Sequence, residues 1–514
     1  MLQFNKDAFP LETHVYQGKE IVYKFYQDIL YCEKPVDPKY QTLNIKEPVS
    51  IGGRPVDASH APIFFGIGCA GFLSSTAASG GTFDAPAGGP GGPGVPDAHP
   101  PMPASQITSS EEWEKMAGGE GHAGGGIMGI QTLGSFQPAG MPGPGGDPGE
   151  AAPPDGSRWG KLALGYVLVE VGCRGRENQW SDGTFYGKAP AAIVDVKAAV
   201  RYLRHNAQLI PGDPEKIITT GGSGGGWQST LVGASGNCTW FEPYLDAIGA
   251  AKERDDIFAS YSTSPIIGHE IADGAVEWQG NALITVPEEK KRSDHLSSLF
   301  GDYLQSETFV GKNGFGRLTI DNLGEYIAKT YLSPDATRYL RKMSADKRDA
   351  YLAAHPWIHY DGNTAVVRFE DFGIYATRDA RVPSFDDLGY EQPGPNLYGN
   401  AHQAARHFTD YSLQLATGDP DAVVDPALKE IVHSQNPIWH ILRKHSDVAP
   451  HWWIRHGACD PCLAVPPAVL LATAAENAEK DVNCRLVWDG GHCEDDDQDE
   501  FLQWVAKITG YSIG

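Results

Sequence analysis

The sequence has no long hydrophobic run and no signal-like start. No stretch of about 18 apolar residues occurs in its 514 residues, which excludes a transmembrane helix. The opening residues, MLQFNKDAFPLETHVYQGK, lack the basic start and apolar run of a signal peptide. We therefore expect a cytoplasmic protein, unless a signal has been removed and the protein is secreted.

Positive charges are scarce. The chain has 41 Lys and Arg against 65 Asp and Glu, a formal net charge of −24. Such a field repels phosphate backbones and anionic lipid surfaces, and no basic cluster offsets it. We expect neither a nucleic-acid nor a membrane partner, only a small-molecule substrate, and the sequence does not indicate an oligomeric state.

Eight cysteines are too few for a disulfide scaffold in a chain of 514 residues. Cys459 and Cys462 form a CxxC motif, which can indicate zinc or redox chemistry. Zinc needs four ligands, and only Cys484, His492 and Cys493 lie nearby in the sequence. Reduced thiols and no metal site are therefore expected.

Apolar runs and glycine-rich turns predict an α/β core. Alternating apolar residues over 19–49 indicate antiparallel strands at a sheet edge. Buried strands are expected within 61–71, 162–175 and 216–220, and a periodic helix begins after Pro190. Strand, helix, strand, turn and helix in this order are typical of a mostly parallel sheet.

Two segments depart from this pattern. Residues from about 79 to 158 are rich in Gly and Pro, and either form a solvent-exposed insertion or a flap over an active-site mouth. Helical patterns dominate 264–447, which predicts an inserted lid domain. The α/β core would then consist of 1–263 and 448–514.

The most specific local motif is the pentamer Gly221-Gly222-Ser223-Gly224-Gly225. It fits the Gly-x-Ser-x-Gly nucleophile elbow of α/β-hydrolases and lies between a predicted strand and a predicted helix. Small residues are needed because a side chain on either flank would clash with the strand or helix beside it. The pattern predicts a nucleophilic serine at Ser223.

A serine hydroxyl needs a general base, and the acid and histidine follow the serine along the chain in this fold. His492 follows CRLVWDGG, a predicted strand that ends in glycines, and Asp460 follows the strand within HWWIRHGACD. Asp489, three residues before His492, is the weaker alternative for the acid. Two backbone N–H groups should form an oxyanion hole, one from Gly224 and the other from Gly71, where the glycine could instead serve only the turn.

These positions together resemble the bacterial tannases of the intracellular type and their tannase-like relatives. The resemblance runs along almost the whole chain and includes PIFFGIGCAGF, GKAPAAIVDVKAAVRYLRHN, IPGDPEKIITTGGSGGG, NLYGNAHQAARHF and IRHGACD. It implies an α/β-hydrolase core with a large helical lid, and carboxylic ester hydrolysis without a cofactor. It also supports Ser223, Asp460 and His492 as the triad.

The chain departs from the tannases where those enzymes hold the galloyl hydroxyls. The Lys, Glu and second Asp of the family correspond here to Ala380, Gly394 and Cys462, with Arg381 a partial substitute for the lysine. A pocket without these polar groups has little reason to prefer gallate. We therefore expect a tannase-like esterase acting on aromatic or phenolic esters, with Trp278 a further candidate for the pocket.

A related fungal group of feruloyl esterases and tannases links a Cys before the serine to a Cys after the histidine. Cys493 follows His492 here, but Gly222 precedes Ser223, so that disulfide is not expected. Two other functions compete with ester hydrolysis. A peptidase or amidase would share the triad, whereas a non-catalytic binding protein on the same scaffold would usually lose a triad member.

Overall fold

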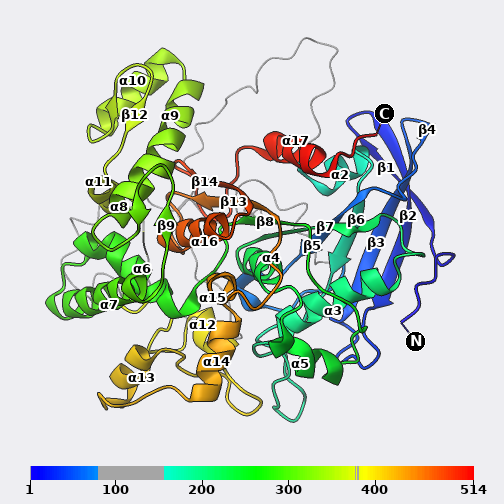
Figure 1. Cartoon of the computed structure of the whole chain (residues 1–514), viewed down its shortest axis with the longest axis horizontal. Helices are drawn as coiled ribbons and strands as arrows, with labels where there is room; N and C mark the ends of the chain where they lie inside the picture. The colour runs from blue at the N-terminus through cyan, green and yellow to red at the C-terminus, as the bar shows by residue number, and fades with distance from the viewer. Residues whose placement is uncertain (1, 79–155, 377, 379–380, 514) are drawn as a thin grey trace, which may run out of the picture.

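The computed structural model describes residues 2–78, 156–376, 378 and 381–513. The Gly/Pro-rich insertion expected at 79–158 therefore lies outside the described residues, apart from its last three. One large sheet dominates the described part, with the strand order β1-β2-β3-β6-β5-β7-β8-β13-β14 and β4 paired to β3 (Figure 1). Strands β1 to β3 are antiparallel, and the run from β6 to β14 is parallel.

The strands of this sheet are short apart from β2, β3 and β7. Their bounds are β1 Leu11–Tyr16, β2 Lys19–Leu30, β3 Thr42–Ile51, β4 Arg54–Pro55, β5 Pro62–Ile67, β6 Val167–Val171, β7 Asp213–Gly222, β8 Ala259–Thr263, β13 His451–Gly457 and β14 Asp481–Val487. Parallel strands are buried on both faces, and β5 and β6 are buried at every residue.

Two core clusters lie on opposite faces of the sheet. Ile63 and Phe65 of β5 pack in one cluster with residues of α3 Ala191–His205, α4 Gly224–Ala234 and α16 Pro466–Asn477. Phe64 packs in the other, with α2 Arg158–Ala163 and α17 Gln498–Thr509. Alternation of side chains along β5 explains this division, since neighbouring residues of a strand point to opposite faces. These layers confirm the predicted α/β-hydrolase architecture.

The chain between β8 and β13 is mainly helical, and most of it lies beyond the parallel edge of the sheet (Figure 1). Its helices are α6 His269–Gly280, η5 Asn281–Leu283, α7 Pro287–Ser306, α8 Leu323–Ile327, η6 Ala328–Leu332, α9 Ser333–Lys342, α10 Ala345–Ala354, α11 Phe369–Tyr375, α12 Pro393–Leu397, α13 Asp410–Thr417, α14 Pro426–Ser434 and α15 Pro437–Arg443. Two short hairpins interrupt them, β9 Val310–Gly311 with β10 Gly316–Arg317 and β11 His359–Tyr360 with β12 Ala365–Val366. The remaining short elements are η1 Ala70–Phe72, η4 Thr239–Phe241 and α5 Glu242–Ala247.

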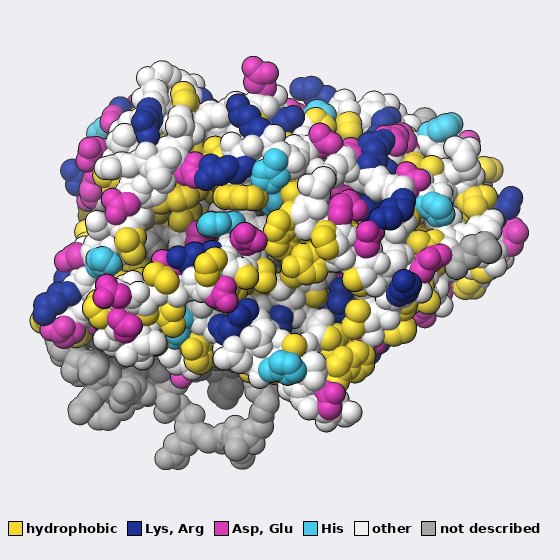
Figure 2. Space-filling model, turned by 60° about the horizontal axis from the view of Figure 1, so that its bottom comes forward, with side chains coloured by type: hydrophobic (Ala, Val, Ile, Leu, Met, Phe, Trp, Pro, Cys, Tyr) yellow, Lys and Arg dark blue, Asp and Glu magenta, His cyan; other side chains and the backbone are white. Residues whose placement is uncertain are grey.

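The surface brought forward in Figure 2 mixes acidic, basic and hydrophobic side chains. The acidic excess of the sequence is thus interspersed with Lys and Arg on this face. Within the described ranges, no helix is both long and apolar enough to span a bilayer.

Candidate active site

Ser223 lies in the turn between β7 and α4, at the centre of the parallel sheet. Its backbone has φ 55° and ψ −121°, a strained conformation for a residue with a side chain. A Cβ atom on Gly221 would lie 2.3 Å from the carbonyl carbon of Gly225, and one on Gly225 would lie 2.3 Å from the Ile67 oxygen. The glycines are therefore required by close packing, as the motif predicts, and the turn places Ser223 at the start of a helix.

The loop that follows β5 packs directly against the start of α4. A Cβ atom on Gly224 would lie 2.0 Å from the Cys69 oxygen and 3.2 Å from the Phe72 nitrogen. Gly71 has φ 58°, in the left-handed region that favours glycine. Because Gly224 is the first residue of α4, its N–H has no partner within the helix.

Two residues that the sequence analysis did not identify hold this loop. Arg176 donates from Nε to the Gly71 carbonyl at 2.8 Å and from its backbone N–H to the Phe72 carbonyl at 2.9 Å. The carboxylate of Glu177 accepts the backbone N–H of Ser74 at 2.9 Å. Nothing in their spacing relative to Gly71 marks these residues in the sequence, because about 100 residues separate the partners.

The buried Asp460 and the partly exposed His492 form an acid–base pair. The His492 Nδ1 atom lies 2.8 Å from Oδ2 of Asp460, whose side chain is fully buried. The other carboxylate oxygen accepts the backbone N–H groups of Cys462 at 2.8 Å and Leu463 at 3.2 Å. These contacts fix the carboxylate and orient the imidazole.

The charges of the pair shift each other's pKa. Burial alone would lower the pKa of His492, but the charge and hydrogen bond of Asp460 outweigh it and raise that pKa well above the ordinary 6.5. Burial would raise the pKa of Asp460, but His492 holds it below its ordinary value. Asp460 is therefore ionised over the whole neutral range.

The end of β8 brings the serine turn and the histidine loop together. The Ser223 N–H donates to the Thr263 carbonyl at 2.9 Å, and the Cys493 N–H donates to Ser264 Oγ at 3.0 Å. A Cβ atom on Gly222 would lie 3.1 Å from Cys493 Sγ. The residue before the serine thus contacts the residue after the histidine.

Asp489, the alternative acid, has different partners. Its carboxylate accepts hydrogen bonds from the hydroxyls of Tyr351 at 2.7 Å and Tyr375 at 2.5 Å. Both tyrosines belong to the helical segment, on α10 and α11. The structure therefore pairs His492 with Asp460 and ties Asp489 to the helices that cover this end of the sheet.

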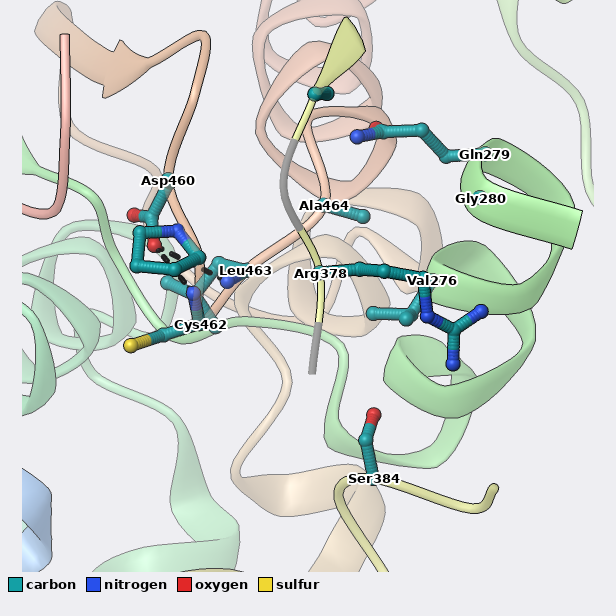
Figure 3. A pocket seen from close by; sticks show the side chains of 11 residues that line it. Val276, Gln279, Gly280, Arg378, Ser384, Asp460, Cys462, Leu463 and Ala464 are labelled. Carbon is teal, nitrogen blue, oxygen red and sulfur yellow. Dashed lines mark hydrogen bonds between the residues drawn. The ribbon is translucent and has the colours of Figure 1, made fainter. Parts of the chain in front are cut away.

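A small, open pocket lies beside Asp460 of the acid–base pair (Figure 3). Its walls are the 460–464 loop with Asp460 and Cys462, the end of α6, and the segment that carries Arg378 and Ser384. Arg378 binds the buried Glu277 through two hydrogen bonds of 2.7 and 2.6 Å. This ion pair neutralises the guanidinium before any ligand enters.

A second small hollow adjoins the first and shares Val276, Leu463 and Ala464 with it. Its other lining residues are Pro265, Ile267, Ala272, Phe385, Pro467 and Ala468. Pro265 follows the end of β8, where the Ser223 N–H is bound, so the hollow lies near the nucleophile turn. Its lining is apolar, which suits a hydrophobic part of a ligand.

The other predicted pocket residues lie in different surroundings. Ala380 lies outside the described residues, and Arg381 is exposed, with Nη2 3.6 Å from Glu391. Gly394 is buried in α12, where a Cβ atom would lie 2.9 Å from the Phe385 oxygen. Trp278 stacks on Phe369 with ring centroids 4.7 Å apart. Of this predicted set, the structure brings Cys462 to the pocket beside Asp460.

One segment of the chain matches a known protein family. The BD-FAE family model matches residues 163–261, which contain β6, α3, β7, α4 and the first three residues of β8. A comparison with curated protein sequences gave no significant match. The region matched by the family model therefore contains the nucleophile elbow.

Solved structures are similar to the chain over almost its whole length. The tannase of Fusobacterium nucleatum is 27% identical, with a TM-score of 0.75 and 99% of each chain covered. The native tannin acyl hydrolase of Lactobacillus plantarum is 28% identical, with a TM-score of 0.74 and the same coverage. A tannin acyl hydrolase in complex with ethyl gallate is 28% identical, with a TM-score of 0.73 and 99% of each chain covered. The chain therefore has an α/β-hydrolase fold with a nucleophile elbow, and it is similar to solved tannases over almost its whole length.

Proposed function

We propose that the protein is a serine carboxylic ester hydrolase that uses Ser223, His492 and Asp460. The observation that carries the proposal is that a strained serine turn lies against the loop of an acid–base pair whose acid is buried. Gly222 and Cys493, the neighbours of Ser223 and His492, are in contact, and His492 Nδ1 lies 2.8 Å from Asp460. This arrangement supplies a nucleophile, a base and a group that orients the base.

In the proposed reaction, His492 takes the proton of the Ser223 hydroxyl while its oxygen attacks the ester carbonyl carbon. Asp460 accepts the Nδ1–H hydrogen bond, so Nε2 is free to receive the proton. The N–H groups of Gly71 and Gly224 stabilise the oxyanion. His492 then protonates the departing alcohol, and a water molecule hydrolyses the acyl-enzyme and releases the acid.

We further propose that the acyl group is aromatic and that gallate is not preferred. Tannin acyl hydrolases similar to this chain have solved structures in complex with ethyl gallate and with 3,4-dihydroxybenzoate. In this chain the pocket offers a thiol at Cys462, and the guanidinium of Arg378 is already paired with Glu277. An apolar hollow adjoins it. Such a lining can contact an aromatic ring but has few groups for its hydroxyls.

The helical segment 264–447 is proposed as a lid domain inserted between two parts of the core, 1–263 and 448–514. Helix α6 and four further residues of this segment, Ala376, Arg378, Ser384 and Phe385, line the two hollows, opposite the 460–464 loop of the core. The segment would thereby select the acyl group, while the core supplies the triad.

Turnover of a small ester panel by the full chain tests the proposal. The panel contains p-nitrophenyl acetate and butyrate, methyl gallate, methyl ferulate and methyl benzoate, with Ser223→Ala as the control. We expect the wild-type protein to hydrolyse esters and Ser223→Ala to be inactive. The rate with methyl gallate should be lower than the rates with the other aromatic esters. Preference for methyl gallate would contradict the pocket assignment. Faster turnover of p-nitroanilides than of p-nitrophenyl esters would indicate an amidase instead.

A further inference from the structure

A cysteine and two histidines meet at the opposite end of the nucleophile helix from Ser223. Cys238 follows α4, His440 lies on α15, and His445 follows α15 after a left-handed turn at Lys444 (φ 54°). One ligand atom from each lies within 4.8 Å of those of the other two. Helix α4 has 11 residues, so it separates this group from the serine by roughly 16 Å.

The hydrogen bonds of His440 prepare its ring for a metal ion. Its Nε2–H donates to the Ser434 carbonyl at 3.0 Å, which leaves a lone pair on Nδ1. That Nδ1 lies 3.1 Å from Nε2 of His445. Two nitrogens bound to one tetrahedral zinc ion are separated by about 3.3 Å, given Zn–N bonds of about 2.0 to 2.1 Å. In metal-binding histidines, the ring nitrogen that does not bind the metal usually donates its hydrogen to a carbonyl or carboxylate, as Nε2 of His440 does here.

The two loops that carry the ligands are already fastened to each other. The Asp447 N–H donates to the Gly236 carbonyl at 2.8 Å, and Ser446 Oγ donates to the Ala234 carbonyl at 2.7 Å. Cys238 and His440 are buried, whereas His445 is exposed and provides a route for the ion to enter. The positive Lys197 nearby is compensated by an ion pair with Asp255 at 2.7 Å.

The geometry points to a zinc-binding site formed by Cys238, His440 and His445, which joins the end of α4 to α15. Thiolate and imidazole ligands favour borderline and soft ions such as Zn²⁺ over Mg²⁺ or Ca²⁺. The three described ligands leave a fourth position for water. Binding forms one Zn–S and two Zn–N bonds and releases the thiol proton of Cys238 to solvent. The hydrogen on Nε2 of His445 moves to its outer nitrogen.

The site could not be predicted from the sequence, because about 200 residues separate Cys238 from the histidines. It is distinct from the CxxC motif and from the esterase site. Its proposed role is structural, since it lies at the far end of the helix that carries the nucleophile. Loss of esterase activity would therefore leave this proposal intact, and the reverse also holds.

Zinc binding by the full chain tests the proposal. After dialysis against a chelator, the protein is titrated with Zn²⁺ in competition with a chromophoric chelator. We expect one bound equivalent, with affinity at least about 10-fold weaker in His445→Gln and in Cys238→Ser, since even supporting residues of metal sites contribute that much. His445 is exposed, so His445→Gln is expected to fold normally.

Two matched controls locate the ion. His433→Gln alters a histidine that stacks on Trp439 near the site and should leave the affinity unchanged. Cys462→Ser removes a member of a second group, with Asp460 and His492, that could attract an ion at the active site. Cobalt substitution should give a thiolate charge-transfer band that Cys238→Ser lacks. The proposal is overturned if the wild type binds no zinc, if both ligand variants bind normally, or if only Cys462→Ser loses the ion.

Discussion

Cys493 Sγ lies 3.1 Å from the position that a Cβ atom would occupy on Gly222, and Cys493 Cβ lies 3.7 Å from it. Disulfides have Cβ–Cβ distances of about 3.5 to 4.5 Å. The residues before the proposed nucleophile and after the proposed base therefore have the spacing of a disulfide, although one of them is a glycine. This spacing shows how closely the two catalytic loops approach each other.

We predict that Gly222→Cys forms a disulfide with Cys493 under mild oxidation. The Thr263 hydroxyl lies 2.8 Å from the new Cβ atom and has to rotate away. Oxidation to each disulfide removes the hydrogens of two thiols. Thiol titration and intact mass should show the loss of two thiols relative to the reduced variant. The double variant Gly222→Cys with Cys493→Ser should show no such loss. If the Gly222→Cys protein keeps all its thiols, the two loops are too far apart for a disulfide, which would contradict the structure.

Gly224→Ala should inactivate the enzyme without unfolding it. The added methyl group would lie 2.0 Å from the Cys69 carbonyl oxygen, so the loop with Gly71 must move away from α4. Loss of one oxyanion donor lowers kcat by about 10²- to 10³-fold, and we expect a decrease of that size. Gly491→Ala is the matched control, since its nearest contact would be an ordinary 3.8 Å from Glu494. Equal activity of the two variants would contradict the proposed oxyanion hole.

The pH dependence of kcat/KM should report the ionisation of His492. The base must be neutral to accept the serine proton, and Asp460 raises its pKa above 6.5. In a plot of kcat/KM against pH, activity should therefore rise as the His492 ring loses its proton, and the midpoint of this rise should lie above pH 6.5. Asp460→Asn removes the charge, so the midpoint should move to lower pH and the rate should drop by roughly 10³- to 10⁴-fold.

Asp489→Asn is the control for the pH experiment. Asp489 accepts hydrogen bonds from Tyr351 and Tyr375 and lies in the same loop region as His492. We expect this variant to keep the midpoint of the rise. If Asp489→Asn moves the midpoint and Asp460→Asn does not, Asp489 is the catalytic acid.

Cys462→Asp should increase the preference for gallate. Cys462 lines the pocket, and the resemblance to the tannases implies an Asp at the corresponding position of those enzymes. A hydrogen bond to a charged group contributes about 1.5 to 3 kcal/mol, so kcat/KM for methyl gallate relative to methyl benzoate should rise about 10-fold. Cys462→Ser controls for the loss of the thiol. An unchanged ratio would show that the ring hydroxyls do not reach this residue.

Much of the fold was predictable because its signals are local. The elbow glycines, the helix after Pro190 and the strand that ends at Gly457 each follow from patterns within a few residues of one another. Strand β8 escaped prediction because its sequence, ASYST, is not apolar. Its buried Ser260 forms a 3.0 Å hydrogen bond with Ser229 of α4. This bond joins segments that are distant in the sequence, so the local pattern does not show it.

The site likewise contains residues that the sequence predicts and residues that only the folded chain brings together. Ser223, Asp460 and His492 each follow a recognisable strand, so their order and spacing can be read from the sequence. Arg176 reaches Gly71 only after β5 and β6 pair side by side, and this depends on the whole sheet. Arg378 and Glu277 likewise pair across 101 residues, so the neutral character of the pocket wall emerges only from the folded chain.

Covalent labelling of the nucleophile tests the central claim most directly. The full chain is incubated with a fluorophosphonate, and intact mass and peptide mapping then locate the adduct. We predict one adduct per chain, on Ser223, which is absent from Ser223→Ala and forms more slowly in His492→Asn. An unlabelled wild-type protein, or an adduct that persists in Ser223→Ala, would contradict the assignment of Ser223 as the nucleophile.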